Sequence, residues 1–207
     1  MSTAIDTAPG TAGLLRTLQA GMVMLFFATC SQGAMAAESA LLHVQSNLSA
    51  ASCEIKVGGD DKVKVRSAIP EEFATINTAG MLGFQVLITN CSGVDTGRTY
   101  GIKVEGNTLT GHPDIFNEDS SDDVGFMLKE NRSGNINYWP GTKASFYTDP
   151  GTVRTGSESW ADSVTSEKDP QQIQLNYFVG VVAPVPGSVK PGPRAVKANL
   201  TFTFMYH

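Results

Sequence analysis

Apolar and polar residues alternate with period two through much of the chain after residue 37, the pattern of half-buried β-strands. The longest run ends the sequence and places six apolar side chains on one face: Val196, Ala198, Leu200, Phe202, Phe204 and Tyr206. Shorter runs of the same kind occupy 40–45, 55–57, 63–65, 84–89, 100–104, 124–128 and 173–182. The pattern therefore predicts a protein built almost entirely from strands.

Stretches rich in Gly, Pro, Asn and Asp separate these runs, as expected of turns. They lie at 58–61, 90–97, 133–135, 140–141 and 184–193. No helical stripe of useful length interrupts them. Short strands at this spacing predict an all-β sandwich, immunoglobulin-like in outline, in which 141–170 is a long polar loop with one hairpin.

The first part of the chain has a different pattern. A short apolar run at 22–28 follows Arg16 and precedes the small-residue sequence Ala34-Met35-Ala36. These features are typical of a secretory signal, so we expect 1–36 to be a signal peptide cleaved after Ala36, with Ala37 as the alternative. A buried core helix, or a lipoprotein anchored through Cys30, would be the competing interpretations. No apolar run is long enough to span a bilayer, so an integral membrane protein is not expected.

Composition narrows the function classes. The net charge is -5 and no basic block is present, which disfavours nucleic-acid binding. Removal of 1–36 takes Cys30 away and leaves two cysteines, Cys53 and Cys91. In an oxidising compartment two remaining thiols should form a disulfide. The alternative, a catalytic cysteine, needs a nearby His base, and the three scattered His residues give it no support.

The sequence shows no common catalytic or phosphate-binding motif, and we expect no catalytic residues, no metal and no cofactor. The acidic run 118–123 lacks the ligand spacing of a calcium loop, so a solvated loop is the preferred interpretation. Trp139 and Trp160 flank the long loop, where a small satellite core is preferred over a sugar-binding surface.

Both ends of the predicted mature chain carry an alternating segment that needs a partner strand, at 37–48 and at 196–206. An apolar strand left uncovered would aggregate. These two segments could pair with each other inside one sandwich or with segments of other chains, and composition does not decide between the two.

Several segments, in this order after a signal sequence, resemble the pilin subunits of chaperone–usher fimbriae of the type 1 kind. The strand before Cys91, the Val-Gly-apolar segment 124–128, Tyr177-Phe178 and the final ten residues with a penultimate Tyr carry the resemblance. The family often has Gly fourteen residues from the end, where this chain has Arg194 and a Gly at 192.

The resemblance implies an incomplete immunoglobulin-like sandwich (the pilin fold) completed by a donor strand from another chain. Residues 37–48 would be the donor-strand extension and 49–207 the pilin domain. Ala40, Leu42 and Val44 would be the donor side chains, and the six apolar residues of 196–206 would line the groove that receives a strand.

The implied partners are a periplasmic pilus chaperone, an outer-membrane usher and neighbouring pilin subunits. The implied role is that of a structural subunit of a surface fimbria that supports adhesion. The competing hypothesis is a self-contained periplasmic β-sandwich, either a carbohydrate-binding module or a small enzyme.

Overall fold

The computed structural model describes residues 40–47, 52–93, 97–163 and 172–207, all within one compact unit, Met35–His207. The predicted signal peptide, residues 37–39 and 48 of the predicted extension, and residues 49–51 at the start of the predicted pilin domain lie outside the described residues. No helix in the described ranges is long and apolar enough to cross a membrane.

The described residues form strands almost throughout, together with one short 3-10 helix. The elements are β1 (Ala40–Asn47), β2 (Ser52–Val57), β3 (Lys62–Val65), η1 (Pro70–Phe73), β4 (Thr78–Ser92), β5 (Thr99–Glu105), β6 (Thr108–Leu109), β7 (His112–Phe116), β8 (Gly125–Glu130), β9 (Glu158–Ser163), β10 (Gln172–Val182) and β11 (Lys197–Tyr206). Every run that alternates in the sequence lies in or beside one of these strands, and the prediction of an all-β sandwich is confirmed.

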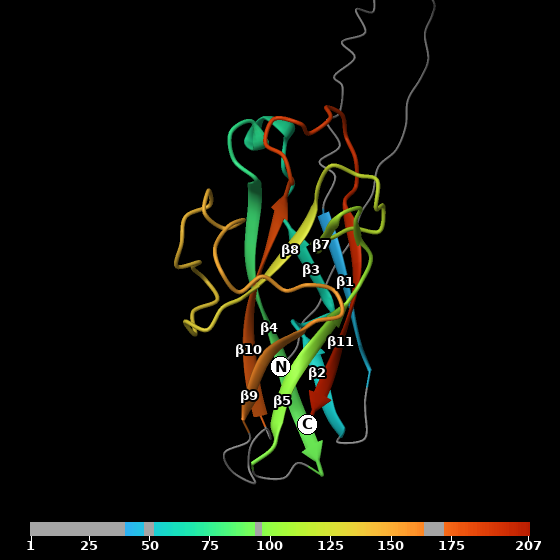
Figure 1. The fold of residues 1–207 in the computed structure, drawn as a ribbon, viewed down its shortest axis with the longest axis vertical. Helices are drawn as coiled ribbons and strands as arrows, with labels where there is room; N and C mark the ends of the chain where they lie inside the picture. The colour runs from blue at the N-terminus through green and yellow to red at the C-terminus, as the bar shows by residue number, and fades with distance from the viewer. Residues whose placement is uncertain (1–39, 48–51, 94–96, 164–171) are drawn as a thin grey trace, which may run out of the picture. The chain divides into compact units, whose positions relative to one another are not determined.

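The strands form two sheets that enclose the core (Figure 1). The five-stranded sheet has the order β3-β1-β11-β5-β9, and the six-stranded sheet has the order β2-β4-β10-β8-β7-β6. All described pairs are antiparallel except one, since β1 runs parallel to β11. Strand β1 therefore lies inside the five-stranded sheet, between β3 and β11.

The main core lies between the sheets and includes an aromatic cluster. Tyr177 of β10 stacks on Phe84 of β4 with 5.6 Å between ring centroids, and Phe202 of β11 meets both rings edge-on. The buried Tyr177 hydroxyl hydrogen-bonds the Ser159 hydroxyl at 2.8 Å, so its polar atom is satisfied. The disulfide Cys53–Cys91 joins β2 to the end of β4, as predicted.

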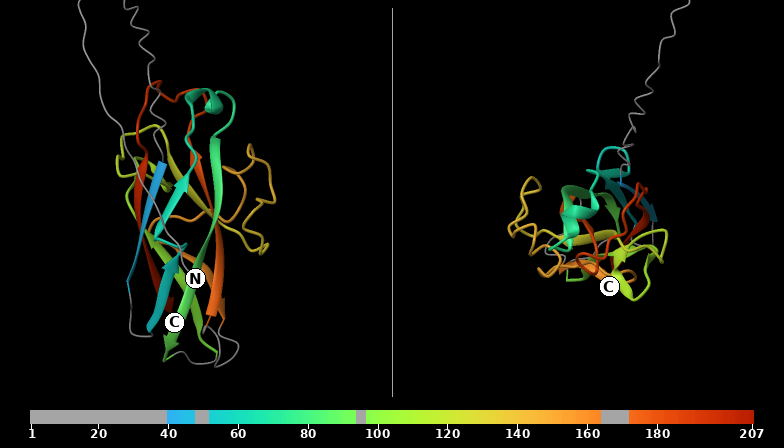
Figure 2. Two further views of the ribbon diagram at one scale, coloured as in Figure 1. Left: turned by 180° about the vertical axis from the view of Figure 1, so that it is seen from behind. Right: turned by 90° about the horizontal axis from the view of Figure 1, so that it is seen from above.

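The two ends of the sandwich form an upper pole and a lower pole. The upper pole, at the top of Figure 1, carries residues 66–77 and 183–196, the loops next to the start of β4 and the start of β11. The lower pole carries the ends of β4 and β11, where the backbones of Thr99 and His207 exchange two hydrogen bonds of 2.9 and 3.1 Å. Figure 2 shows the upper loops side by side from behind.

The long polar segment 141–170 differs from its prediction. It does not contain a hairpin in its described part, because β9 pairs instead with β5, across the five-stranded sheet. β9 is a polar edge strand whose sequence, ESWADS, shows little apolar alternation. The sequence therefore carried no signal for it.

A second, smaller cluster packs outside the six-stranded sheet. Trp139 meets Phe146 and Phe178 at centroid distances of 5.1 and 5.4 Å, so the interpretation of Trp139 as part of a satellite core is confirmed. Trp160 differs, because its half-buried ring packs against the main core beside Tyr177.

Lys129 of β8 is fully buried beneath this satellite cluster. Its ammonium donates to the carbonyl oxygens of Tyr147 and Asp149 and, at 2.6 Å, to Thr152 Oγ1. Burial lowers the pKa of Lys129. The Lys129 ammonium thus binds the 147–152 segment to the six-stranded sheet.

Candidate functional site: a strand groove filled by the chain's own N-terminal segment

The candidate site is the position between β3 and β11, because no other described strand joins these two. β1 occupies it, antiparallel to β3 and parallel to β11. Hydrogen bonds at its two edges include Leu41 N to Val196 O at 3.1 Å and Val44 N to Asp61 O at 3.3 Å. Without β1, the five-stranded sheet would be split by a groove as long as one strand.

The side chains of β1 alternate as the sequence predicts. Leu42 and Val44 point into the core, with exposed fractions of 0% and 5%, while Leu41 and His43 are half-buried and Gln45 is exposed. Leu42 lies opposite Val63 on one side and Ala198 on the other. Burial of a Leu or Val side chain contributes roughly 1.5–3 kcal/mol, so these two anchor the strand. Ala40, the third predicted donor residue, begins β1 opposite Val65.

The predicted groove residues come together on β11. Val196, Ala198, Leu200, Phe202 and Phe204 are buried and belong to the main core, and Tyr206 is half-buried against it. Tyr100 of β5 stacks on Phe204 with 6.1 Å between centroids, which fixes the ring at the lower end of the strand.

The opposite wall of the groove was not assigned from the sequence. Val63 and Val65 of β3 are buried at 4% and 2% exposure and pair with β1. Their alternation with Lys62 and Lys64 predicts a half-buried strand, which is the signal that could have found them. Alternation with a period of two does not indicate which strand lies beside it.

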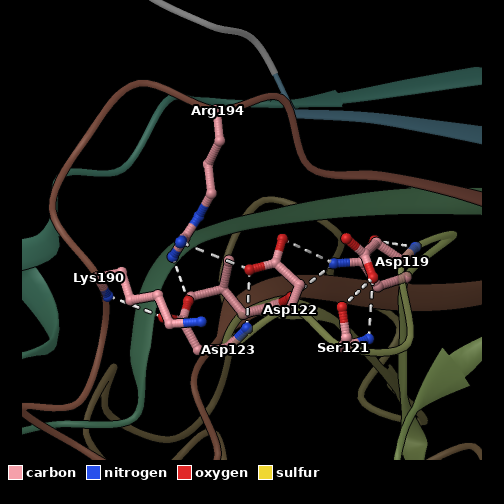
Figure 3. Close-up of polar contacts among 8 residues, drawn as sticks. Asp119, Ser121, Asp122, Asp123, Lys190 and Arg194 are labelled. Carbon is pink, nitrogen blue, oxygen red and sulfur yellow. Dashed lines mark hydrogen bonds and ion pairs between the residues drawn. The ribbon is translucent and has the colours of Figure 1, made fainter.

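The segment that leads into β11 is held by a charged network at the upper pole (Figure 3). The Arg194 guanidinium reaches down to the carboxylates of Asp122 and Asp123, and Asp123 also accepts the backbone N–H of Lys190 at 2.8 Å. Gly192 has φ +125°, a conformation that side-chain-bearing residues rarely adopt. The backbone thus requires a glycine at position 192, two residues before Arg194.

Glu118 extends the same network along the edge of β11. Its backbone N–H donates to Lys197 O at 2.8 Å, and its carboxylate accepts the N–H of Asn199 at 2.9 Å. β11 is therefore bordered by β1 on one side and by Glu118 on the other where β5 no longer reaches it. The acidic run is an exposed loop, as predicted, but its half-buried members serve as hydrogen-bond and ion-pair partners.

The site offers binding surface rather than reactive groups. Cys53 and Cys91 are joined in the disulfide, and His207 lies at the lower pole with Nε2 3.1 Å from Glu158. Among the residues the structure describes, no group of three or more His, Cys, Asp or Glu side chains could hold a metal ion. What the arrangement can do is bind one extended segment through main-chain hydrogen bonds and alternate side-chain pockets.

The model of the family described as "Fimbrial protein" matches residues 42–207. A search of curated protein sequences found no significant match.

Several solved structures are similar to the chain, among them the following three. The P pilus rod subunit PapA has 15% identity and a TM-score of 0.46, over 67% of this chain and 86% of that one. A chaperone–usher pilus structure has 14% identity and a TM-score of 0.46, over 98% of this chain and 100% of that one. A type I fimbria protein and antigen of Burkholderia pseudomallei has 15% identity and a TM-score of 0.37, over 81% of this chain and 90% of that one.

Proposed function

Because the chain belongs to the fimbrial protein family, we propose that it joins its neighbours in a surface fimbria by strand exchange at the groove between β3 and β11. The observation that carries the proposal is that the groove is shaped for one strand and that β1 has the matching pattern. Leu42 and Val44 fill it in the single chain. The same segment of a neighbouring copy has the same side chains to offer.

The direction in which a neighbour's strand enters decides what is assembled. The chain of each subunit leaves β1 at the lower pole, because β1 ends beside Thr203 and β2 begins beside Ser92. A neighbour's strand parallel to β11 would bring lower pole to lower pole. Each copy could then fill the other's groove, which gives a closed, isologous pair.

An antiparallel strand brings the lower pole of one copy to the upper pole of the next. This contact is heterologous and leaves one free groove and one free strand at the two ends, so it continues as a filament. Reversal of the strand makes its pairing with β11 antiparallel and its pairing with β3 parallel, so one pairing of each kind is kept. A fimbria therefore requires the strand that is antiparallel to β11, because only that direction gives a contact that continues along a filament.

The remaining partners follow from the same groove. A periplasmic chaperone would supply a strand to the groove before assembly, and an outer-membrane usher would be the place where a neighbour's segment replaces it. The predicted signal peptide at 1–36 supplies the export route, with no catalytic role for the chain at any step.

One observation favours the competing hypothesis of a self-contained periplasmic module. β1 completes the chain's own sandwich, as it would in a protein that folds and acts alone. An isolated subunit has its own β1 at hand, however, so self-filling is expected in both cases. The two hypotheses differ in whether β1 can leave the groove.

Leu42→Asp tests this, with Gln45→Asp as the matched control. Leu42 is fully buried and Gln45 is exposed on the same strand. When a chaperone strand fills the groove, residue 42 is expelled to solvent, so both variants should co-purify with the chaperone. Only Leu42→Asp should fail to form fibres, because its carboxylate must be desolvated in the next groove. If Leu42→Asp forms no chaperone complex, β1 is required by its own fold and the self-contained module is supported.

A further inference from the structure

The upper pole carries exposed apolar side chains that the fold of a single chain does not explain. Ile69 is 57% exposed and Val185 is 58% exposed. Among the described residues, two other large apolar side chains are exposed, Leu82 at 40% and Tyr138 at 62%. Leu82 lies on β4 and Tyr138 in the loop after β8, both at the six-stranded sheet.

The loops that carry Ile69 and Val185 form one surface. Gly187 N donates to Phe73 O at 2.8 Å, and the Asn77 side chain donates to the carbonyl oxygens of Ala183 and Pro184 at 2.8 and 3.0 Å. Figure 2 shows η1 and the 183–196 loop together at this end. Backbone hydrogen bonds between the loops hold the apolar side chains in a fixed arrangement before any partner arrives, which lowers the entropic cost of binding.

The length of the chain between β1 and β2 determines what reaches this surface in a filament. Residues 48–51 separate Asn47 from Ser52, so the Cα atoms of 47 and 52 lie at most about 18 Å apart. An antiparallel donor strand ends at the acceptor's upper pole, beside the start of β11. The lower pole of the donor's own sandwich must then lie within that distance of the upper pole.

Resting on the proposed strand exchange, we propose that the upper pole is a docking surface for the lower pole of the next copy of this chain, with Ile69 and Val185 at its apolar centre. Several charged side chains near this centre are paired within the subunit. Arg66 and Lys143 both bind the Glu72 carboxylate, as Arg194 binds Asp122 and Asp123. An apolar centre inside a polar rim is the usual composition of a protein interface.

Site-directed cross-linking tests the geometry. Thr99 is exposed at the lower pole and Val185 at the upper pole, so a bis-maleimide cannot join them within one chain. In fibres of the double variant Thr99→Cys/Val185→Cys, treated with a short bis-maleimide, we expect a ladder of cross-linked multimers on denaturing gels. Thr99→Cys alone should give no cross-linked product. Dimers from Thr99→Cys alone, or no ladder from the double variant, would overturn the proposal.

Charge substitutions test the contribution of the surface. Ile69→Asp and Val185→Asp should each lower the yield of fibres by about tenfold, because a carboxylate must be desolvated at the centre of the contact. The controls Leu82→Asp and Tyr138→Asp introduce the same charge at exposed apolar positions on the six-stranded sheet, away from the pole, and should assemble normally. All four should reach wild-type periplasmic amounts in complex with the chaperone.

The failure of this proposal and that of strand exchange are distinguishable. If Leu42→Asp blocks assembly while Ile69→Asp and Val185→Asp both assemble like the wild type, strand exchange stands and the docking surface is wrong. If Leu42→Asp assembles normally, the exchange itself is wrong. Equal losses from the pole variants and the controls would show a general effect of surface charge and would also overturn the docking surface.

Discussion

Truncation of Leu42 measures how much the chain's own β1 contributes to the fold of the isolated subunit. Leu42 is fully buried between Val63 of β3 and Ala198 of β11. Leu42→Ala removes this apolar contact without adding charge. Gln45→Ala is the matched control, since Gln45 lies three residues later on the exposed face of the same strand.

The magnitude follows from burial. Leu→Ala in a packed core lowers the free energy of unfolding by about 2–5 kcal/mol, the spread depending on how far the cavity collapses. An exposed substitution away from specific contacts changes it by about 0.5 kcal/mol or less. With a urea m-value of roughly 1–3 kcal/mol/M, the midpoint for Leu42→Ala should fall by roughly 1–2 M and that for Gln45→Ala should hardly move.

The assay is equilibrium urea unfolding of the purified, oxidised single chain in the absence of chaperone. Equal m-values for the two variants would show that the compactness of the folded state is unchanged. If Leu42→Ala unfolds at the same midpoint as Gln45→Ala, residue 42 is not in the core of the isolated subunit. The self-filled groove would then be refuted.

Three further predictions concern the disulfide, the ion pairs and β11. Unreduced mature protein should take up no thiol-alkylating reagent, and reduction of Cys53–Cys91 should lower the free energy of unfolding by about 4 kcal/mol, measured by urea unfolding with and without reductant. Arg66 holds the pKa of Glu72 at about 2, below its usual 4.5, so its stabilisation is present above pH 4.5 and is lost as pH falls toward 2. Glu72→Gln should therefore lose less stability than the wild type between pH 5 and pH 3 in the same unfolding assay, and equal losses would contradict this. Phe202→Asp or Phe204→Asp should be degraded in the periplasm because each buries a carboxylate, whereas Thr203→Asp on the outward face should accumulate normally on immunoblots.

The sequence predicted which side chains face the core but not which strands are neighbours. The alternation of 196–206 determines the buried face of β11, because a strand's side chains alternate with a period of two. The same property holds for β1, yet alternation is identical whether a strand pairs with its own sheet or another chain's. The sequence therefore left the partner of 37–48 open, and the structure places β1 beside β11 of the same chain.

Two other features lay beyond pattern reasoning for a physical reason. Strand β9 is polar because it lies at a sheet edge, where main-chain pairing with β5 needs little apolar surface. Lys129 stands in an apolar run, and its burial depends on carbonyl oxygens supplied by a loop about twenty residues later. Contacts of this kind depend on the folded path of the chain and leave no local periodicity.

The position of β1 has a consequence for the supply of subunits. A chain whose groove holds its own N-terminal strand can neither receive a neighbour nor be received by one. When β1 leaves the groove, the same event opens the groove and frees β1 on the same molecule. In the absence of a chaperone strand, subunits thus become competent to accept and to donate at the same moment and in equal numbers. A chaperone strand in the groove would separate the two functions, because β1 would be free to enter a neighbour while the groove stayed closed to one.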